Sequence, residues 1–234
     1  MVKKQLLPFI KDKDLYQHVK VVLDVAKNAT DDAEEKIYSN VTDPFSALFD
    51  ASNQSISLAE WMGQEKSRQI QKTLQNAIGE FHQNMLGPMP GWINLKTGSV
   101  SDLSNKKKKI IAEVKNKYNT TKGNYRTAIY DDFKKLLKSG YVGYGAYYVE
   151  VISKGRKAYD KPFMPSDNRT GKRRPKNKSI RVIDGKSFYA LASGNPEALK
   201  QLYLALPTAI RKILGKTINK VRADEFVTLF ERAY

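Results

Sequence analysis

The sequence predicts an α/β (α+β) fold in which a central mixed β-sheet is flanked by helices. Two observations predict it. Segments with apolar residues at helical spacing alternate with short segments rich in β-branched and aromatic residues. Between residues 57 and 153 these segments follow one another as helix, strand, strand, helix and strand, an order typical of a sheet with helices packed on it.

The helices are indicated by their apolar spacing and their end signals. We expect a helix over residues 13–28 and a stronger one from Ser57, where Ser57 and Glu60 have capping-box spacing, to the Gly-Pro pair at 87–88. Asn124 is the expected cap of a helix that runs to about residue 138. A helix is expected after Asn195 and Pro196, followed by two short ones over 207–214 and 224–233.

The clearest strand covers residues 110–118, IIAEVKNKY. Side chains alternate along a strand, so Ile110, Ala112 and Val114 point to one face while the ionic side chains of Glu113 and Lys115 point to the other. Further strands are predicted over residues 141–153 and 180–183, and the Ser-Asn pair at 104–105 is predicted to form a turn before the first strand.

Composition limits the kinds of chemistry that are available. The chain has 234 residues, enough for one well-buried domain over residues 1–234, and has no apolar run long enough for a membrane span or a secretory signal, so a cytoplasmic location is expected. It has no cysteine and only two histidines, which excludes disulfides, thiolate catalysis and cysteine-ligated zinc. A metal ion would therefore have to be held by carboxylates.

Charge is divided unevenly along the chain. Residues 1–90 carry 10 basic and 12 acidic residues, a net charge of −2, whereas residues 91–234 carry 31 basic and 12 acidic residues, a net charge of +19. A positive surface of this size favours a polyanion through phosphate neutralisation and release of counterions. Nucleic-acid binders share this feature with ribosomal and membrane-surface proteins, so charge alone indicates a class of partner and no reaction.

An acid, any residue and a lysine on one strand face is the pattern that a magnesium-dependent phosphodiesterase needs. Random placement in so lysine-rich a chain gives roughly three such tripeptides, and the sequence has four, which start at Glu34, Glu113, Asp132 and Asp184. The match at Glu113 differs from the others because it lies in a strand-like segment and has an aspartate, Asp102, upstream. The alternative is an amphipathic strand whose charges are merely solvated.

The chemistry of these residues assigns them roles. Asp102 and Glu113 can hold Mg²⁺ through carboxylate oxygens, and Lys115 can orient or deprotonate the attacking water and offset charge that develops on the phosphorus. Lys117 is a candidate phosphate contact on the same strand face. Glu80, at the edge of the apolar stripe of the helix that begins at residue 57, is a candidate third metal ligand, or an ordinary flanking charge.

Two polar segments are candidates for DNA binding. The first follows the strand and contains amide, hydroxyl and basic side chains. The second is a basic segment over residues 154–181, predicted to be a long mobile loop that orders on nucleic acid, or a loop that is simply solvated. The candidate residues are Asn119, Thr120, Thr121, Lys122, Asn124 and Arg126 in the first segment, and Arg169, Lys172, Arg173, Arg174, Lys176, Lys178 and Arg181 in the second.

The segment TGSVSDLSNKKKKIIAEVKNKYNTTKGNYR, together with more weakly matching segments around residues 78–87 and 188–199, resembles the PD-(D/E)XK nucleases. Within them it is similar to type II restriction endonucleases that read GGNCC-like sites. Ser101 stands where the family's proline precedes the aspartate, so Asp102 is less firmly matched than Glu113 and Lys115.

The resemblance implies Mg²⁺-dependent hydrolysis of double-stranded DNA at a short palindrome, which leaves a 5′-phosphate and a 3′-hydroxyl. It also implies a homodimer and a functional pairing with a cognate DNA methyltransferase. A repair or junction-resolving nuclease of the same fold, a non-catalytic nucleic-acid-binding protein and a structural protein of a ribonucleoprotein remain alternatives.

Overall fold

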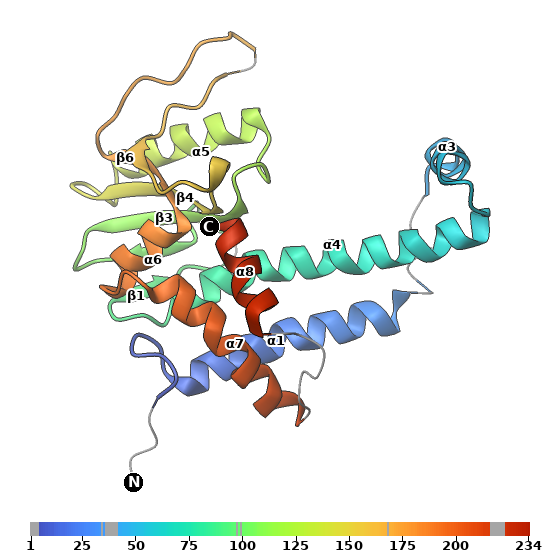
Figure 1. Ribbon diagram of the computed structural model, residues 1–234. Helices are drawn as coiled ribbons and strands as arrows, with labels where there is room; N and C mark the ends of the chain where they lie inside the picture. The colour runs from blue at the N-terminus through green and yellow to red at the C-terminus, as the bar shows by residue number, and fades with distance from the viewer. Residues whose placement is uncertain are drawn as a thin grey trace.

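The computed structural model describes residues 5–33, 35, 42–96, 98, 100–167, 169–215 and 223–234. One mixed sheet of six strands has helices on both faces, which confirms the predicted fold class (Figure 1). The helices are α1 (Asp12–Asp31), α3 (Pro44–Gln54), α4 (Leu58–Leu86), α5 (Gly123–Leu136), α6 (Gly185–Ser193), α7 (Ala198–Leu214) and α8 (Ala223–Ala233). Glu34, the first of the four acid-x-Lys matches, lies outside the described residues.

The sheet has the strand order β1-β2-β3-β4-β6-β5. Its three central strands β3, β4 and β6 are parallel, so their carboxyl ends meet at one edge; β1, β2 and β5 pair antiparallel with their neighbours. The strands are β1 (Trp92–Asn94), β2 (Leu103–Asn105), β3 (Ile110–Lys117), β4 (Gly145–Ile152), β5 (Asp160–Pro162) and β6 (Ile180–Asp184).

The alternation predicted for β3 is confirmed by the two hydrophobic cores that it separates. Ile110, Ala112 and Val114 are buried on the face covered by α1, α4, α6 and α7. Ile111 is buried on the opposite face, against α5 and the segment that carries Phe163. Glu113 and Lys115 follow Ile111 at period two and therefore share the face of the sheet that α5 covers.

Helix α6 packs very closely on the sheet at Gly185. A Cβ atom at this position would lie 2.4 Å from the carbonyl oxygen of Val151 in β4. Only glycine leaves room for this approach, which brings Phe188 and Tyr189 of α6 into the core on that face.

The capping box of Ser57 and Glu60 is confirmed at the start of α4. Three local predictions are wrong. Ser104 and Asn105 are buried in β2, because the turn falls on residues 106–109, where the Asn105 side chain accepts a hydrogen bond from the Lys108 N–H at 2.9 Å. Asn124, predicted to cap the helix after β3, lies inside α5, whose N-cap is Lys122. Helix α7 continues through Pro207 as one helix, held by its apolar face against α1 and α6.

The basic segment 154–181 is more ordered than a long mobile loop. It contains a short 3-10 turn (Lys154–Arg156), strand β5 and a β-bridge between Ser166 and Arg173. Its outer part projects beyond β6 next to α5 (Figure 1).

Helix α4 has 29 residues and reaches well past the sheet, where its first turns carry α3 (Figure 1). In the ranges that the structure describes, no helix combines the length and the apolar character required to cross a membrane.

Candidate active site

The pairing of β2 with β3 brings Asp102 beside Glu113. Leu103 pairs with Ala112 in the antiparallel register, so Asp102, one residue before β2, stands opposite Glu113. Residues opposite each other on antiparallel strands present their side chains on the same face, with Cβ atoms about 5 Å apart. The two carboxyl groups therefore come from separate strands and meet at one point on the α5-covered face.

Backbone hydrogen bonds hold Asp102 in this position. Its N–H donates to the carbonyl oxygen of Ala112 at 2.9 Å, and its Oδ2 accepts a hydrogen bond from the Val114 N–H at 2.7 Å. Lys115, on the same strand face as Glu113, places its Nζ 2.6 Å from Glu113 Oε1. The predicted trio of Asp102, Glu113 and Lys115 is thus brought together.

Burial and mutual repulsion alter the protonation of the two carboxyl groups. The side chain of Glu113 is 14% exposed; its burial and the charge of Asp102 raise its pKa to about 7. Burial also raises the pKa of Asp102, against the opposing effect of the hydrogen bond from Val114 and the charge of Lys115. In the absence of a cation the pair holds a proton near neutral pH.

The ammonium group of Lys115 stays charged. Burial would lower its pKa, but the adjacent charges of Glu113 and Asp102 outweigh that effect and raise it. The single ammonium group of Lys115 therefore faces two carboxyl groups. When both carboxyl groups are ionised, one negative charge is left without a partner, which a bound cation would neutralise.

An aromatic side chain that no pattern in the sequence indicated adjoins this group. Tyr148 of β4 is paired with Glu113 in the parallel register and is fully buried. Its ring stacks on Phe163 with centroids 4.7 Å apart, and the guanidinium carbon of Arg126 lies 4.9 Å from its ring centroid. The Tyr148 hydroxyl has no hydrogen-bond partner among the described residues.

A second polar group lies beside Lys115 on the neighbouring strand. Glu150 pairs with Lys115 in register and is buried. Its carboxylate accepts hydrogen bonds from Arg126 Nη1 at 2.5 Å and from the Tyr159 hydroxyl. Asp184 follows in register on β6, where it caps α6 by accepting a hydrogen bond from the Ser187 N–H at 3.0 Å. Neither acid was predicted to belong to the site: Glu150 lies within the predicted strand 141–153, and Asp184 follows the predicted strand 180–183.

Glu80 lies exposed on α4. Among the residues that the structure describes, no three histidine, aspartate or glutamate side chains are grouped so that they could bind a metal ion. The structure therefore does not add Glu80 to the pair of Asp102 and Glu113.

His82, two residues after Glu80, is buried in the core, where its Nδ1 lies 2.9 Å from the Tyr189 hydroxyl. Burial lowers the pKa of His82 to about 4.

The first candidate DNA-binding segment lies at the carboxyl end of β3. Asn119, Thr120, Lys122 and Asn124 are exposed, while Lys117 and Thr121 are half-buried. Arg126 is engaged within the protein, by Glu150 and by the carbonyl oxygen of Tyr118 at 3.1 Å. Tyr125, which the sequence interpretation omitted, is strongly exposed at the start of α5.

The seven basic residues of the second segment that were predicted to bind DNA fall into two groups. Arg174 pairs with Asp131 of α5 at 2.7 Å and with Asp167 at 3.3 Å, and Arg181 pairs with Asp160 at 2.5 Å, so both brace the segment against the protein. The other five of the seven are exposed: Arg169, which also pairs with Asp167 at 3.6 Å, and Lys172, Arg173, Lys176 and Lys178.

Known proteins similar to this chain are restriction endonucleases. A family model described as the Eco47II restriction endonuclease matches residues 7–215. The chain is 42% identical to the type II restriction enzyme Eco47II of Escherichia coli, over 98% of this chain and 99% of that one. It is 27% identical to the type II restriction enzyme Sau96I of Staphylococcus aureus, over 87% of this chain and 79% of that one. No solved structure matches the chain. The chain belongs to the Eco47II restriction endonuclease family and is a type II, site-specific endonuclease.

Proposed function

We propose that this endonuclease hydrolyses double-stranded DNA with Asp102, Glu113 and Lys115 as its catalytic residues and Mg²⁺ as its cofactor. The observation that carries the proposal is the meeting of two half-buried carboxyl groups and one ammonium group at the junction of β2 and β3. The same acid-x-Lys spacing occurs at Asp132, but there it lies on helix α5 and not on a strand.

The residues fit a divalent cation. Two half-buried carboxyl groups face one ammonium group, and burial together with the charge of Asp102 raises the pKa of Glu113; a cation bound between the two carboxylates would offset their repulsion. Mg²⁺ takes one or two carboxylates and fills its remaining positions with water and phosphate oxygens, which suits a pair without a third acid. Asp102 and Glu113 would hold the ion. When bound, it supplies charge that polarises the scissile phosphate and acidifies the attacking water.

Lys115 acts as a hydrogen-bond donor and a positive charge. Its raised pKa keeps it protonated, so it orients the attacking water and offsets the negative charge that develops on the phosphorus. Lys117, two residues further along the same face, contacts a neighbouring phosphate. The expected products carry a 5′-phosphate and a 3′-hydroxyl.

DNA binding follows from the positive half of the chain. The exposed residues of segment 119–124 and five exposed basic residues between 169 and 178 neutralise phosphates, and side chains among them read base edges in the major groove. Because each chain carries one catalytic group, a two-fold homodimer on a short palindrome cuts both strands. The proposed target is a GGNCC-like site, and the proposed setting is the cytoplasm, where a cognate methyltransferase protects the host DNA.

Digestion of an unmodified plasmid tests the proposal. With Mg²⁺ we expect discrete fragments whose sequenced ends share one palindrome, and with a chelator we expect intact plasmid. Single-strand nicks, or ends without a common palindrome, would exclude the dimeric restriction mechanism. Activity confined to branched DNA would instead indicate a junction-resolving nuclease of the same fold.

A further inference from the structure

Helix α3 stands apart from the sheet at the far end of α4 (Figure 1). It is held there by a small cluster in which its Ala47 and Ala51 pack on Trp61 of α4. The indole Nε1 of Trp61 also donates a hydrogen bond to Asp50 Oδ2 at 2.9 Å. One face of α3 is thus fixed to α4, which makes the pair a defined arm.

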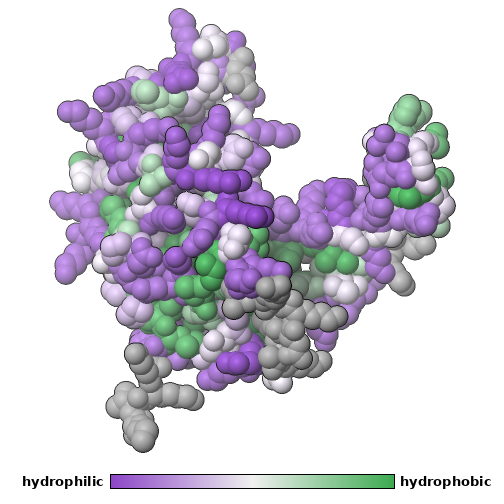
Figure 2. Space-filling model, viewed as in Figure 1, coloured by the Kyte–Doolittle hydropathy of each residue, from purple (hydrophilic) through white to green (hydrophobic). Residues whose placement is uncertain are grey.

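The other face of α3 is apolar and exposed. Phe45 and Phe49 are each 73% exposed and Leu48 is 56% exposed; Leu58, at the start of α4, is 54% exposed. Positions 45, 48 and 49 have the i, i+3, i+4 spacing of a single helical stripe. Figure 2 shows hydrophobic side chains gathered on this helix at the tip of the arm, above a largely hydrophilic α4.

The charge of α3 is unsuited to DNA. Helix α3 contains one acidic residue, Asp50, and no lysine or arginine, and Asp43 precedes it as the N-cap. Contacts with a phosphate backbone are made chiefly by basic residues, which this chain places in its last three fifths. An exposed apolar stripe without positive charge instead fits a protein surface.

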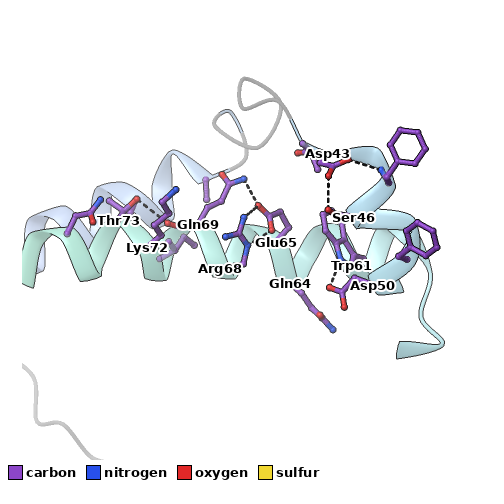
Figure 3. A pocket seen from close by; sticks show the side chains of 17 residues that line it. Asp43, Ser46, Asp50, Trp61, Gln64, Glu65, Arg68, Gln69, Lys72 and Thr73 are labelled. Carbon is purple, nitrogen blue, oxygen red and sulfur yellow. Dashed lines mark hydrogen bonds and ion pairs between the residues drawn. The ribbon is translucent and has the colours of Figure 1, made fainter. Parts of the chain in front are cut away.

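The stripe borders a concave part of the surface. A cavity of about 1280 Å³ lies between α3, α4 and the end of α1; Phe45 and Phe49 of the stripe line it together with Trp61, and most of its other lining side chains are polar or charged. Figure 3 shows the Asp50–Trp61 contact at one end and the Glu65–Arg68 pair further along α4. An exposed apolar stripe that borders a cavity can pack against the same surface of a second copy across a two-fold axis.

The exposed apolar area is of the size that a dimer contact uses. An aromatic side chain can bury about 150–250 Å², so the exposed parts of the two phenylalanines and two leucines together offer on the order of 400–500 Å². This is more than half of the roughly 800 Å² that each partner contributes to a stable interface. The cavity walls supply further area.

We infer that the apolar stripe of α3 and the adjoining cavity form the surface on which a second copy of this chain docks. This inference rests on the proposed homodimer and says where its contact lies. At the other end of α4, Phe81, Met85 and Leu86 are buried in the core that includes β3. A contact at α3 would therefore fix the separation of the two catalytic groups through two α4 helices, each about 43 Å long at about 1.5 Å per residue.

Sedimentation equilibrium with and without DNA tests the position of the contact. In the Phe45→Ser/Phe49→Ser variant we expect the dimer dissociation constant to rise by roughly 100-fold or more. Leu229→Ser, a control that removes another strongly exposed apolar side chain (64%) from α8, should leave the dissociation constant within a few-fold of wild type. Circular dichroism checks that each variant is folded.

A cysteine cross-link gives a second readout that does not depend on removing the stripe. The chain has no cysteine, so Leu48→Cys introduces a single thiol near the expected two-fold axis, and Leu229→Cys introduces one away from it. With a short bis-maleimide we expect a covalent dimer from the first variant alone. If the wild type is a dimer but the serine variant stays dimeric and neither thiol cross-links, the position inferred here is wrong and the homodimer stands. A wild type that is monomeric on cognate DNA would overturn both.

Discussion

Replacing Glu113 with glutamine should stabilise the metal-free protein at alkaline pH while it removes catalysis. The pKa of Glu113 is raised from 4.5 to about 7 by burial and by the charge of Asp102. The folded state therefore favours the protonated carboxyl group, which contributes stability that is fully present below pH 4.5 and is lost as the pH rises through about 7. A glutamine amide keeps the shape and can donate a hydrogen bond to Asp102, but it never becomes charged.

The size of this effect follows from the pKa difference. At about 1.36 kcal/mol per pKa unit, the rise from 4.5 to about 7 corresponds to about 3 kcal/mol of unfolding free energy. In a chain of this length that is a rise of roughly 6–12 °C in Tm at pH 8. His82 changes the stability in the opposite direction over an overlapping pH range. Its pKa is lowered to about 4, so the stability that its neutral form contributes is lost as the pH falls below 6.5.

The assay is therefore a comparison of two proteins, in which the contribution of His82 cancels. Urea unfolding of wild type and Glu113→Gln in a chelator should show the variant to be more stable at pH 8 and the two to converge near pH 4.5. Mg²⁺ at pH 8 should then stabilise the wild type much more than the variant. A variant that is no more stable than wild type at pH 8, or a difference independent of pH, would refute this description of the carboxyl pair.

Three further predictions follow from interactions elsewhere in the protein. Gly185→Ala should destabilise the fold by about 3 kcal/mol or more in urea unfolding, because its Cβ would overlap the backbone of Val151. Arg126→Gln should cost about 2–4 kcal/mol, because it leaves the buried Glu150 without its cation, and adding Glu150→Gln should restore part of that stability. The third prediction concerns the exposed side chains of Arg173, Lys176 and Lys178 in the basic segment. Neutralising all three should weaken binding to all DNA sequences and reduce the slope of log affinity against log salt concentration by about 0.9 for each phosphate that is no longer neutralised. Gel shifts at several salt concentrations measure both effects. Unchanged affinity for random DNA would indicate that the segment reads bases.

Much of the site could be predicted because it depends on local pattern. Strand alternation in β3 determined which face carries Glu113 and Lys115, and the lack of cysteine left carboxylates as the available metal ligands. Asp102 was chosen for its position upstream, but its place opposite Glu113 depends on the register of β2, which the predicted turn at residues 104–105 would have shifted.

The remaining features depend on interactions between distant segments. Arg126 is a basic residue in a polar segment, and only the fold shows that Glu150, 24 residues away, binds it. Tyr148 resembles any other strand residue until the β3–β4 register places it beside Glu113. Likewise, no local signal distinguishes the alanine face of α3, which packs on α4, from the exposed face with Phe45 and Phe49.

The central claim is that the acid-x-Lys tripeptide on β3 carries out catalysis, and measuring cleavage and binding together on matched variants tests it most directly. Glu113→Gln and Lys115→Ala should each lower the rate of Mg²⁺-dependent plasmid cleavage by several orders of magnitude while gel-shift affinity stays near that of wild type. Lys134→Ala, in the same tripeptide on α5, should keep cleavage within a few-fold of wild type. Near-normal cleavage by either β3 variant would contradict the assignment.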